Sequence, residues 1–238
     1  MDLNALNAQV PKILSKRRNK VSKLFTVEQL DLQFSNNTTM TYERLMGGNG
    51  AILAVPFDGK DFLLTSEYAC GFERYELGFL KGKIDANETP KEACNRELKE
   101  EIGFGAQNIM TLRNEMTVAP GMLQLKMYTY LCTGLYEMHL DGDEPEPISI
   151  VKVSPKEAKD LIFDVDSPLT EARAIAALTL ALNRLNMFKK IALLMHTFKA
   201  LLILFPILFV FAMIKHVFQV FVFSTIAKTF IFVCRMGA

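Results

Sequence analysis

The sequence lacks the features that mark a secreted or zinc-binding protein. The N-terminal stretch MDLNALNAQV contains no apolar core of signal-peptide length. No CxxC pair is present, which argues against a zinc site or a disulfide framework. The cysteines are Cys70, Cys94, Cys132 and Cys234. We therefore expect the body of the chain in the reducing cytoplasm.

Acidic residues are missing from the end of the chain. From Met187 onward there are six Lys or Arg and no Asp or Glu. The 186 residues before that point hold 21 bases and 26 acids, so their formal charge is −5. A mildly acidic body has no general electrostatic footprint of a nucleic-acid-binding protein. We expect no nucleic acid among the partners.

The same C-terminal segment lacks an apolar run long enough to cross a bilayer. Its ten phenylalanines are interrupted by bases, and its longest apolar run, 200–214, has fifteen residues. A membrane-spanning helix needs about twenty. Three interpretations stay open for this hydrophobic, basic tail: a helical membrane anchor or interfacial pair over 190–235, an additional core element, or a non-native extension.

The body of the chain shows the patterns of a mixed α/β protein. Residues 12–23 carry six bases and are expected to form a solvated arm, with a phosphate-attracting arm as the alternative. Alternating apolar residues predict a β-hairpin over 24–46, and two apolar runs on either side of the turn Asp58-Gly59-Lys60 predict a second over 51–69. Further strands are expected near 74–79, 125–133 and 148–153, and a helix over 168–186 after Ser167.

A second helix is predicted directly after residue 89. Thr89 is a good N-cap, Pro90 suits the first helical position, and Glu92 completes a capping box. Gly103 can end the helix in a left-handed conformation. Between these ends an apolar stripe recurs every four residues and is expected to face the core. The stripe consists of Cys94, Leu98 and Ile102.

Three glutamates crowd one edge of this helix. Glu97 and Glu101 form the stripe next to the apolar one, and Glu100 lies about 60° from Glu97 on its other side. Like charges three or four residues apart on a helix repel each other, which costs roughly a few tenths of a kcal/mol per pair. A bound cation would therefore explain why the three glutamates are crowded together. Mg²⁺ prefers carboxylate oxygens, and a carbonyl of the 81–87 loop can join them. The cluster predicts metal-assisted hydrolysis of a phosphoanhydride.

The spacing of these residues resembles a known motif. The pattern Gly82-x5-Glu88-x7-Arg96-Glu97-Leu98-x-Glu100-Glu101-x-Gly103-Phe104 resembles the Nudix box at all nine of its defined positions. The resemblance implies a Nudix α/β/α sandwich, here with an N-terminal β-hairpin and the hydrophobic C-terminal tail. We expect a basic arm over 1–20, a Nudix hydrolase domain over 21–186 and the tail over 187–238.

The resemblance also implies an activity. Residues 75–79, YELGF, and 142–147, GDEPEP, are similar to the ADP-compound hydrolases within the family. This similarity implies Mg²⁺ or Mn²⁺ dependence and hydrolysis of ADP-ribose, NADH and short diadenosine polyphosphates to release AMP. It further implies a homodimer. The alternative is a catalytically silent, Nudix-like sensor that binds ADP-ribose, against which the retention of all three glutamates argues.

Roles for the box residues follow from the resemblance. Glu97, Glu100 and Glu101 are expected to bind the metal, together with the carbonyl of Gly82 or of Lys81. Arg96 is expected to orient these glutamates. Glu88 is expected to brace the loop by pairing with Arg96 or with backbone amides.

Residues outside the box are expected to complete the site. The resemblance implies a general base from an acidic loop about fifty positions after the helix. Glu144 and Glu146 lie at about that separation, in a turn stiffened by prolines, and either is a candidate; the alternative is a solvated acidic turn. Glu76 and Glu67 are expected at the adenine or ribose end of the substrate. Tyr75 is expected either to stack on a base or to lie in the core.

Overall fold

The computed structural model describes residue 1 and residues 3–142 and 144–187. The expected tail, including its membrane contact through 190–235, lies almost entirely outside these residues. None of the helices in the described part is long and apolar enough to span a bilayer.

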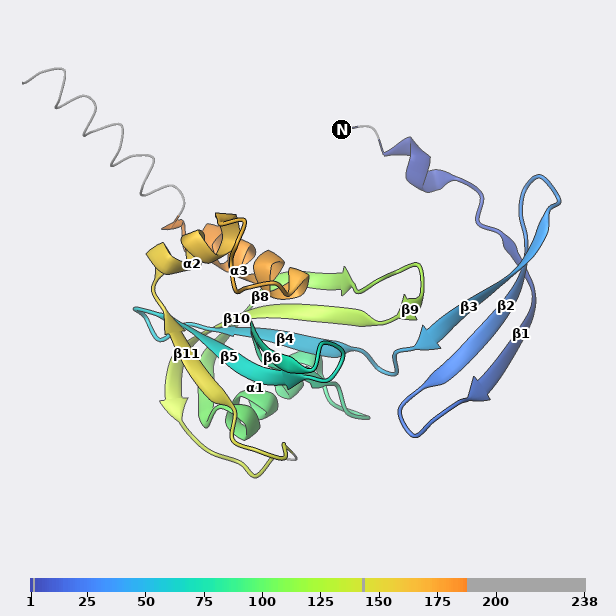
Figure 1. The fold of residues 1–238 in the computed structure, drawn as a ribbon. Coiled ribbons are helices and arrows are strands. Elements are labelled where there is room, and N and C mark those ends of the chain that lie inside the picture. The colour runs from blue at the N-terminus through green and yellow to red at the C-terminus, as the bar shows by residue number, and fades with distance from the viewer. Residues whose placement is uncertain (2, 143, 188–238) are drawn as a thin grey trace, which may run out of the picture. The chain divides into compact units, whose positions relative to one another are not determined.

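A mixed four-stranded sheet forms the middle layer of the domain. Its two central strands run parallel to each other, and each outer strand is antiparallel to its neighbour. Helix α1 (Pro90–Glu101) packs on one face, and α3 (Ala172–Arg184), with α2 (Pro155–Phe163) beside it, covers the other (Figure 1). The strands in spatial order are β7 (Lys81–Lys83), β4 (Ala51–Pro56), β10 (Lys126–Glu137) and β8 (Phe104–Thr117). The predicted α/β/α sandwich is confirmed.

A second sheet carries the hairpin that borders the site. Its order is β11 (Ser149–Val153), β5 (Phe62–Ala69) and β6 (Arg74–Gly78). The predicted hairpin over 51–69 is wrong beyond a single bridge between Phe57 and Phe62. Strand β4 is buried along its whole length and pairs with β7 and β10, whereas β5 pairs with β6 and β11. The two strands therefore belong to different sheets.

The N-terminal residues form a third sheet after a short 3₁₀ helix, η1 (Asn4–Asn7). Its strands are β1 (Lys12–Lys20), β2 (Thr26–Gln33), β3 (Thr39–Met46) and β9 (Leu123–Gln124). The predicted hairpin is β2 with β3, but the basic segment is a strand rather than an arm. One cause is Glu28, which is fully buried and accepts hydrogen bonds from Arg18 on β1 and Arg44 on β3.

Helix α1 begins and ends where the sequence predicts. The side chain of Thr89 accepts from the Glu92 amide, and the Glu92 carboxylate accepts from the Thr89 amide. Gly103 follows the helix with φ of 72°. The stripe of Cys94, Leu98 and Ile102 is buried against the central sheet. The opposite edge of the helix is thereby held at a fixed place beside β7.

The C-terminal helix begins later than expected. Ser167 does not cap a helix, because its hydroxyl donates to the carbonyl of Leu161 and accepts from the amide of Leu169 in a turn. Helix α3 starts at Ala172. Before this turn lies α2, which was not among the helices expected from the sequence, although Ser154 and Glu157 form a capping box there.

Candidate active site

The side chain of Glu97 on α1 packs directly against Gly82 on β7. A β-carbon added to Gly82 would lie 1.8 Å from Cδ and 1.9 Å from Oε1 of Glu97. Glycine at this position therefore leaves the space that the Glu97 side chain occupies, and a larger residue would force that side chain to move. The Glu97 carboxylate and the Gly82 backbone are thereby brought together.

Arg96 donates all five of its N–H groups to oxygen atoms around it. Two of them donate to Glu88, at 2.9 and 3.0 Å, and one donates to the carbonyl of Lys83 at 2.9 Å. The Nη1 atom donates to one oxygen each of Glu97 and Glu100, both at 2.8 Å. The three carboxylates, Glu88 foremost, raise the pKa of Arg96, which therefore stays charged.

Glu88 also supports the loop before the helix. Its carboxylate accepts from the amide of Asp85 at 3.2 Å in addition to the Arg96 guanidinium. The hydrogen bonds from Arg96 lower the pKa of Glu88 despite partial burial. Loop and helix are thus joined through one ion pair.

Glu101 is the least solvated of the three glutamates. Its Oε2 atom is buried and has no hydrogen-bond partner among the described residues. Burial, followed by the charges of Glu67, Glu97 and Glu144, raises the pKa of Glu101 to about 9, while Lys81 opposes the shift. Burial also raises the pKa of Glu97, although Arg96 counteracts it. The positive charge near Glu97 and Glu101 is therefore too small to offset the effect of burial on their pKa values.

These glutamates line a cavity of about 490 Å³, which we call the carboxylate cavity. Asp141, Gly142 and Glu144 contribute to its wall, so the acidic turn does reach the box helix. Glu146 does not line it. Its carboxylate instead accepts a hydrogen bond of 2.6 Å from the hydroxyl of Tyr75. Tyr75 is 58% exposed and thus lies outside the core.

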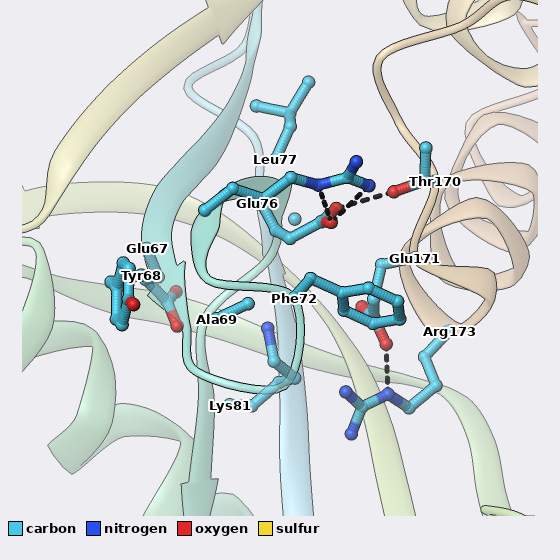
Figure 2. A pocket seen from close by; sticks show the side chains of 12 residues that line it. Glu67, Tyr68, Ala69, Phe72, Glu76, Leu77, Lys81, Thr170, Glu171 and Arg173 are labelled. Carbon is cyan, nitrogen blue, oxygen red and sulfur yellow. Dashed lines mark hydrogen bonds and ion pairs between the residues drawn. The ribbon is translucent and has the colours of Figure 1, made fainter.

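A second cavity of about 450 Å³ lies between the β5–β6 hairpin and the segment before α3; we call it the hairpin cavity (Figure 2). Glu67 and Glu76 both line it. Glu76 accepts from Thr170 at 2.6 Å and from Arg74 at 2.7 Å, and these bonds lower its pKa. Lys81 lines both cavities.

Several residues that line the hairpin cavity were not predicted from the sequence. Phe72 is 73% exposed at the hairpin tip, and Thr170, Glu171 and Arg173 approach from a segment about a hundred positions away. An unusual density of aromatic residues over 68–75 was the available signal for Phe72. No local pattern marks 170–173, because its place beside the hairpin depends on the tertiary fold.

The carboxylate cavity fits a divalent cation by its chemistry. Arg96 binds one oxygen each of Glu97 and Glu100, which leaves the second oxygen of each, and the buried oxygen of Glu101 has no partner among the described residues. Oxygen donors of this kind suit Mg²⁺ and Mn²⁺. Across the described residues, no three acidic, His or Cys side chains are already gathered into a complete binding group.

Comparisons with known proteins agree with this arrangement. The NUDIX domain matches residues 49–172, and the NudE-type Nudix hydrolase N-terminal domain matches residues 11–44. The chain is 44% identical over 173 residues to the ADP compounds hydrolase NudE of Escherichia coli (strain K12), covering 72% of this chain and 91% of that protein.

Two further relatives extend the comparison. The ADP-ribose pyrophosphatase of Bacillus subtilis (strain 168) is 27% identical over 117 residues, or 48% of this chain and 62% of that protein. A crystal structure of an ADP compounds hydrolase superposes with a TM-score of 0.69 at 42% identity, covering 75% of this chain and 95% of the other. The chain belongs to the Nudix hydrolase family and is a pyrophosphohydrolase of that family.

Proposed function

We propose that this enzyme hydrolyses the diphosphate linkage of ADP-linked compounds and releases AMP. The proposed substrates are ADP-ribose, NADH and short diadenosine polyphosphates. The observation that carries the proposal is the carboxylate cavity, where Glu97, Glu100 and Glu101 meet Glu144 beside a second cavity large enough for part of a nucleotide. The names of the two curated relatives, one an ADP compounds hydrolase and one an ADP-ribose pyrophosphatase, support it.

We assign the box glutamates to a metal site. Glu97, Glu100 and Glu101, with the carbonyl of Gly82 or Lys81, would hold Mg²⁺ or Mn²⁺, which when bound neutralises phosphate oxygens and positions the attacking water. Arg96 orients Glu97 and Glu100 through the bonds described above. Glu88 keeps Arg96 and the loop in place.

We assign the general base to Glu144. It lines the carboxylate cavity and acts electrostatically on Glu101, whereas Glu146 is bound to Tyr75. Glu144 accepts a proton from water as the water oxygen attacks phosphorus. The bridging P–O bond breaks, and for ADP-ribose the products are AMP and ribose 5-phosphate. Glu67 and Glu76 belong to the part of the site that receives the nucleoside or ribose.

One measurement separates this enzyme from a silent sensor. Purified protein is incubated with ADP-ribose, with Mg²⁺ or with EDTA, and AMP is quantified by chromatography. AMP that appears only with Mg²⁺ supports the proposal. Binding of ADP-ribose without AMP release would favour the sensor. A panel of ADP-ribose, NADH and diadenosine compounds, compared by kcat/KM, then ranks the substrates.

We also propose that the enzyme is a homodimer. The β1–β3 sheet exposes apolar side chains, among them Ile13, Leu14, Met40 and Tyr42. Within the described chain, only its pairing with the short strand β9 extends this sheet. A second copy could cover such a surface.

A further inference from the structure

Lys81 occupies the boundary between the two cavities. It lies on β7 directly before Gly82, and it lines both the carboxylate cavity and the hairpin cavity. Figure 2 shows its side chain directed into the hairpin cavity, with Glu67 to one side and Glu171 to the other. A ligand that extends from one cavity into the other would lie beside this residue.

Five cations of the described chain line these cavities, and their partners differ. Arg96 is bound to Glu88, Glu97 and Glu100, as described above. The remaining arginines are paired as well, Arg74 with Glu76 and Arg173 with Glu171. The other two cations are Lys81 and Lys83, neither of which forms an ion pair with a described residue.

The two lysines are not equivalent. Lys83 is exposed and lines only the carboxylate cavity. Lys81 is half-buried, and its ammonium donates a hydrogen bond to the neutral carbonyl of Phe79, which leaves further N–H groups and a full positive charge. Lys81 is therefore the cation available to an anion that lies between the cavities.

The surroundings make this single charge important. Glu67 and Glu171 face the hairpin cavity, and Oε2 of Glu171 is buried without a partner in the described structure. The Lys81 ammonium and this Glu171 oxygen both lie close to Gly78. A β-carbon built on Gly78 would be 3.5 Å from Nζ of Lys81 and 3.8 Å from Oε2 of Glu171. A phosphate entering here is repelled by carboxylates and needs a nearby cation to offset that repulsion.

We propose that Lys81 binds the phosphate that joins the nucleoside end of the substrate to the metal-binding end. This inference rests on the proposed function, and it adds a specificity-determining residue to it. The ammonium donates charge-assisted hydrogen bonds to the phosphate of the AMP half. The enzyme thereby distinguishes a phosphorylated nucleoside from a free one.

The test compares two ligands that differ by one phosphate. Dissociation constants of AMP and adenosine are measured calorimetrically in Mg²⁺ for the full chain and for Lys81→Met. AMP binding should weaken by about 10- to 100-fold, as expected for loss of a hydrogen bond to a charged group. Adenosine binding should change by less than about twofold, since adenosine has no phosphate for the ammonium to bind.

Control variants isolate the position from the charge. Lys91→Met removes the same charge from the exposed start of α1 and should leave both dissociation constants unchanged. Lys81→Arg should recover part of the AMP affinity. Equal loss for AMP and adenosine, or no loss for either, would overturn the proposal. Circular dichroism of Lys81→Met distinguishes a folding defect from the removal of a phosphate-binding group.

Turnover distinguishes failure of this inference from failure of the proposed function. If the unaltered chain releases AMP from ADP-ribose but Lys81→Met keeps the same kcat/KM, the assignment of Lys81 is wrong. If the unaltered chain is inactive but the AMP-to-adenosine difference still depends on Lys81, the binding residue stands and the hydrolytic function fails.

Discussion

At the scale of single residues, Glu101 departs most from an ordinary surface carboxylate. Its pKa of about 9 means that the metal-free protein holds it protonated at neutral pH. Glu101→Gln imitates that neutral state, so the melting temperature in EDTA should not fall. We expect kcat on ADP-ribose to fall by a factor of about 10³ or more, because a metal ligand is lost. An active variant would refute the metal assignment.

The same residue predicts how stability depends on pH. Because the folded-state pKa of Glu101 is raised above its ordinary value of 4.5, the folded metal-free protein binds a proton that the unfolded chain releases. The contribution of Glu101 to stability is thus present below pH 4.5 and is lost as pH rises toward 9. Urea unfolding in EDTA at about pH 6 and about pH 8.5 should show this loss in the unaltered chain. A Glu101→Gln protein with the same decline would disprove the cause.

The two glutamates of the acidic turn are expected to behave differently. Glu144→Gln should lower kcat by about 10² to 10⁴, the range for loss of a general base. Glu146→Gln can still accept the hydrogen bond from Tyr75, so we expect kcat within a factor of about three. Steady-state kinetics at saturating Mg²⁺ would decide the matter. The reverse order would transfer the role of base to Glu146.

At the scale of secondary-structure elements, α1 and α2 start in the same way but carry different functions. Each has a Ser or Thr N-cap, a proline next and a reciprocal glutamate. Thr89→Ala and Ser154→Ala should each lower the free energy of unfolding by about 1 kcal/mol. Only Thr89→Ala should also reduce kcat, since α1 carries Glu97, Glu100 and Glu101. Equal effects on kcat would show that the start of α1 does not position the site.

The two capping boxes show which structural features could be predicted from the sequence. The ends of α1 were predictable because its caps, its apolar stripe and its terminating glycine all lie within about fifteen residues, and α2 carries the same kind of local signal at its start. The partners of β4 and β5 were not predictable in this way. Their adjacency in sequence and the Asp58-Gly59 turn suggested a hairpin, but burial of β4 on both faces favours pairing with β7 and β10.

At the scale of the whole molecule, the described site lies entirely before the hydrophobic tail. Residues 1–185 form one compact unit. A chain that ends at Asn186 should therefore keep the kcat of the full chain on ADP-ribose. Light scattering on the same shortened chain tests the proposed dimer and should give twice the chain mass. Lost activity would mean that the tail supports the site. A monomer at micromolar concentration would contradict the proposed dimer.

The site as a whole was only partly visible in the sequence. The box glutamates were predictable because they share one helix, and so was the approach of Glu144. The hairpin cavity was not, because Glu67 and Lys81 meet Glu171 only after β5, β7 and the start of α3 have been assembled. The sequence indicated a role for the carbonyl of Lys81, whereas the structure shows that this residue lines both cavities.

Arg96 has a consequence for the enzyme when cations are scarce. Its guanidinium is part of the chain, so Glu97 and Glu100 keep hydrogen bonds to a cation whether or not a metal ion is bound, and Glu101 can hold a proton instead. Under the proposed metal assignment, removal of the divalent ion should therefore stop turnover without unfolding the protein. Adding the ion back should restore turnover as fast as the ion binds, because the protein does not have to refold first.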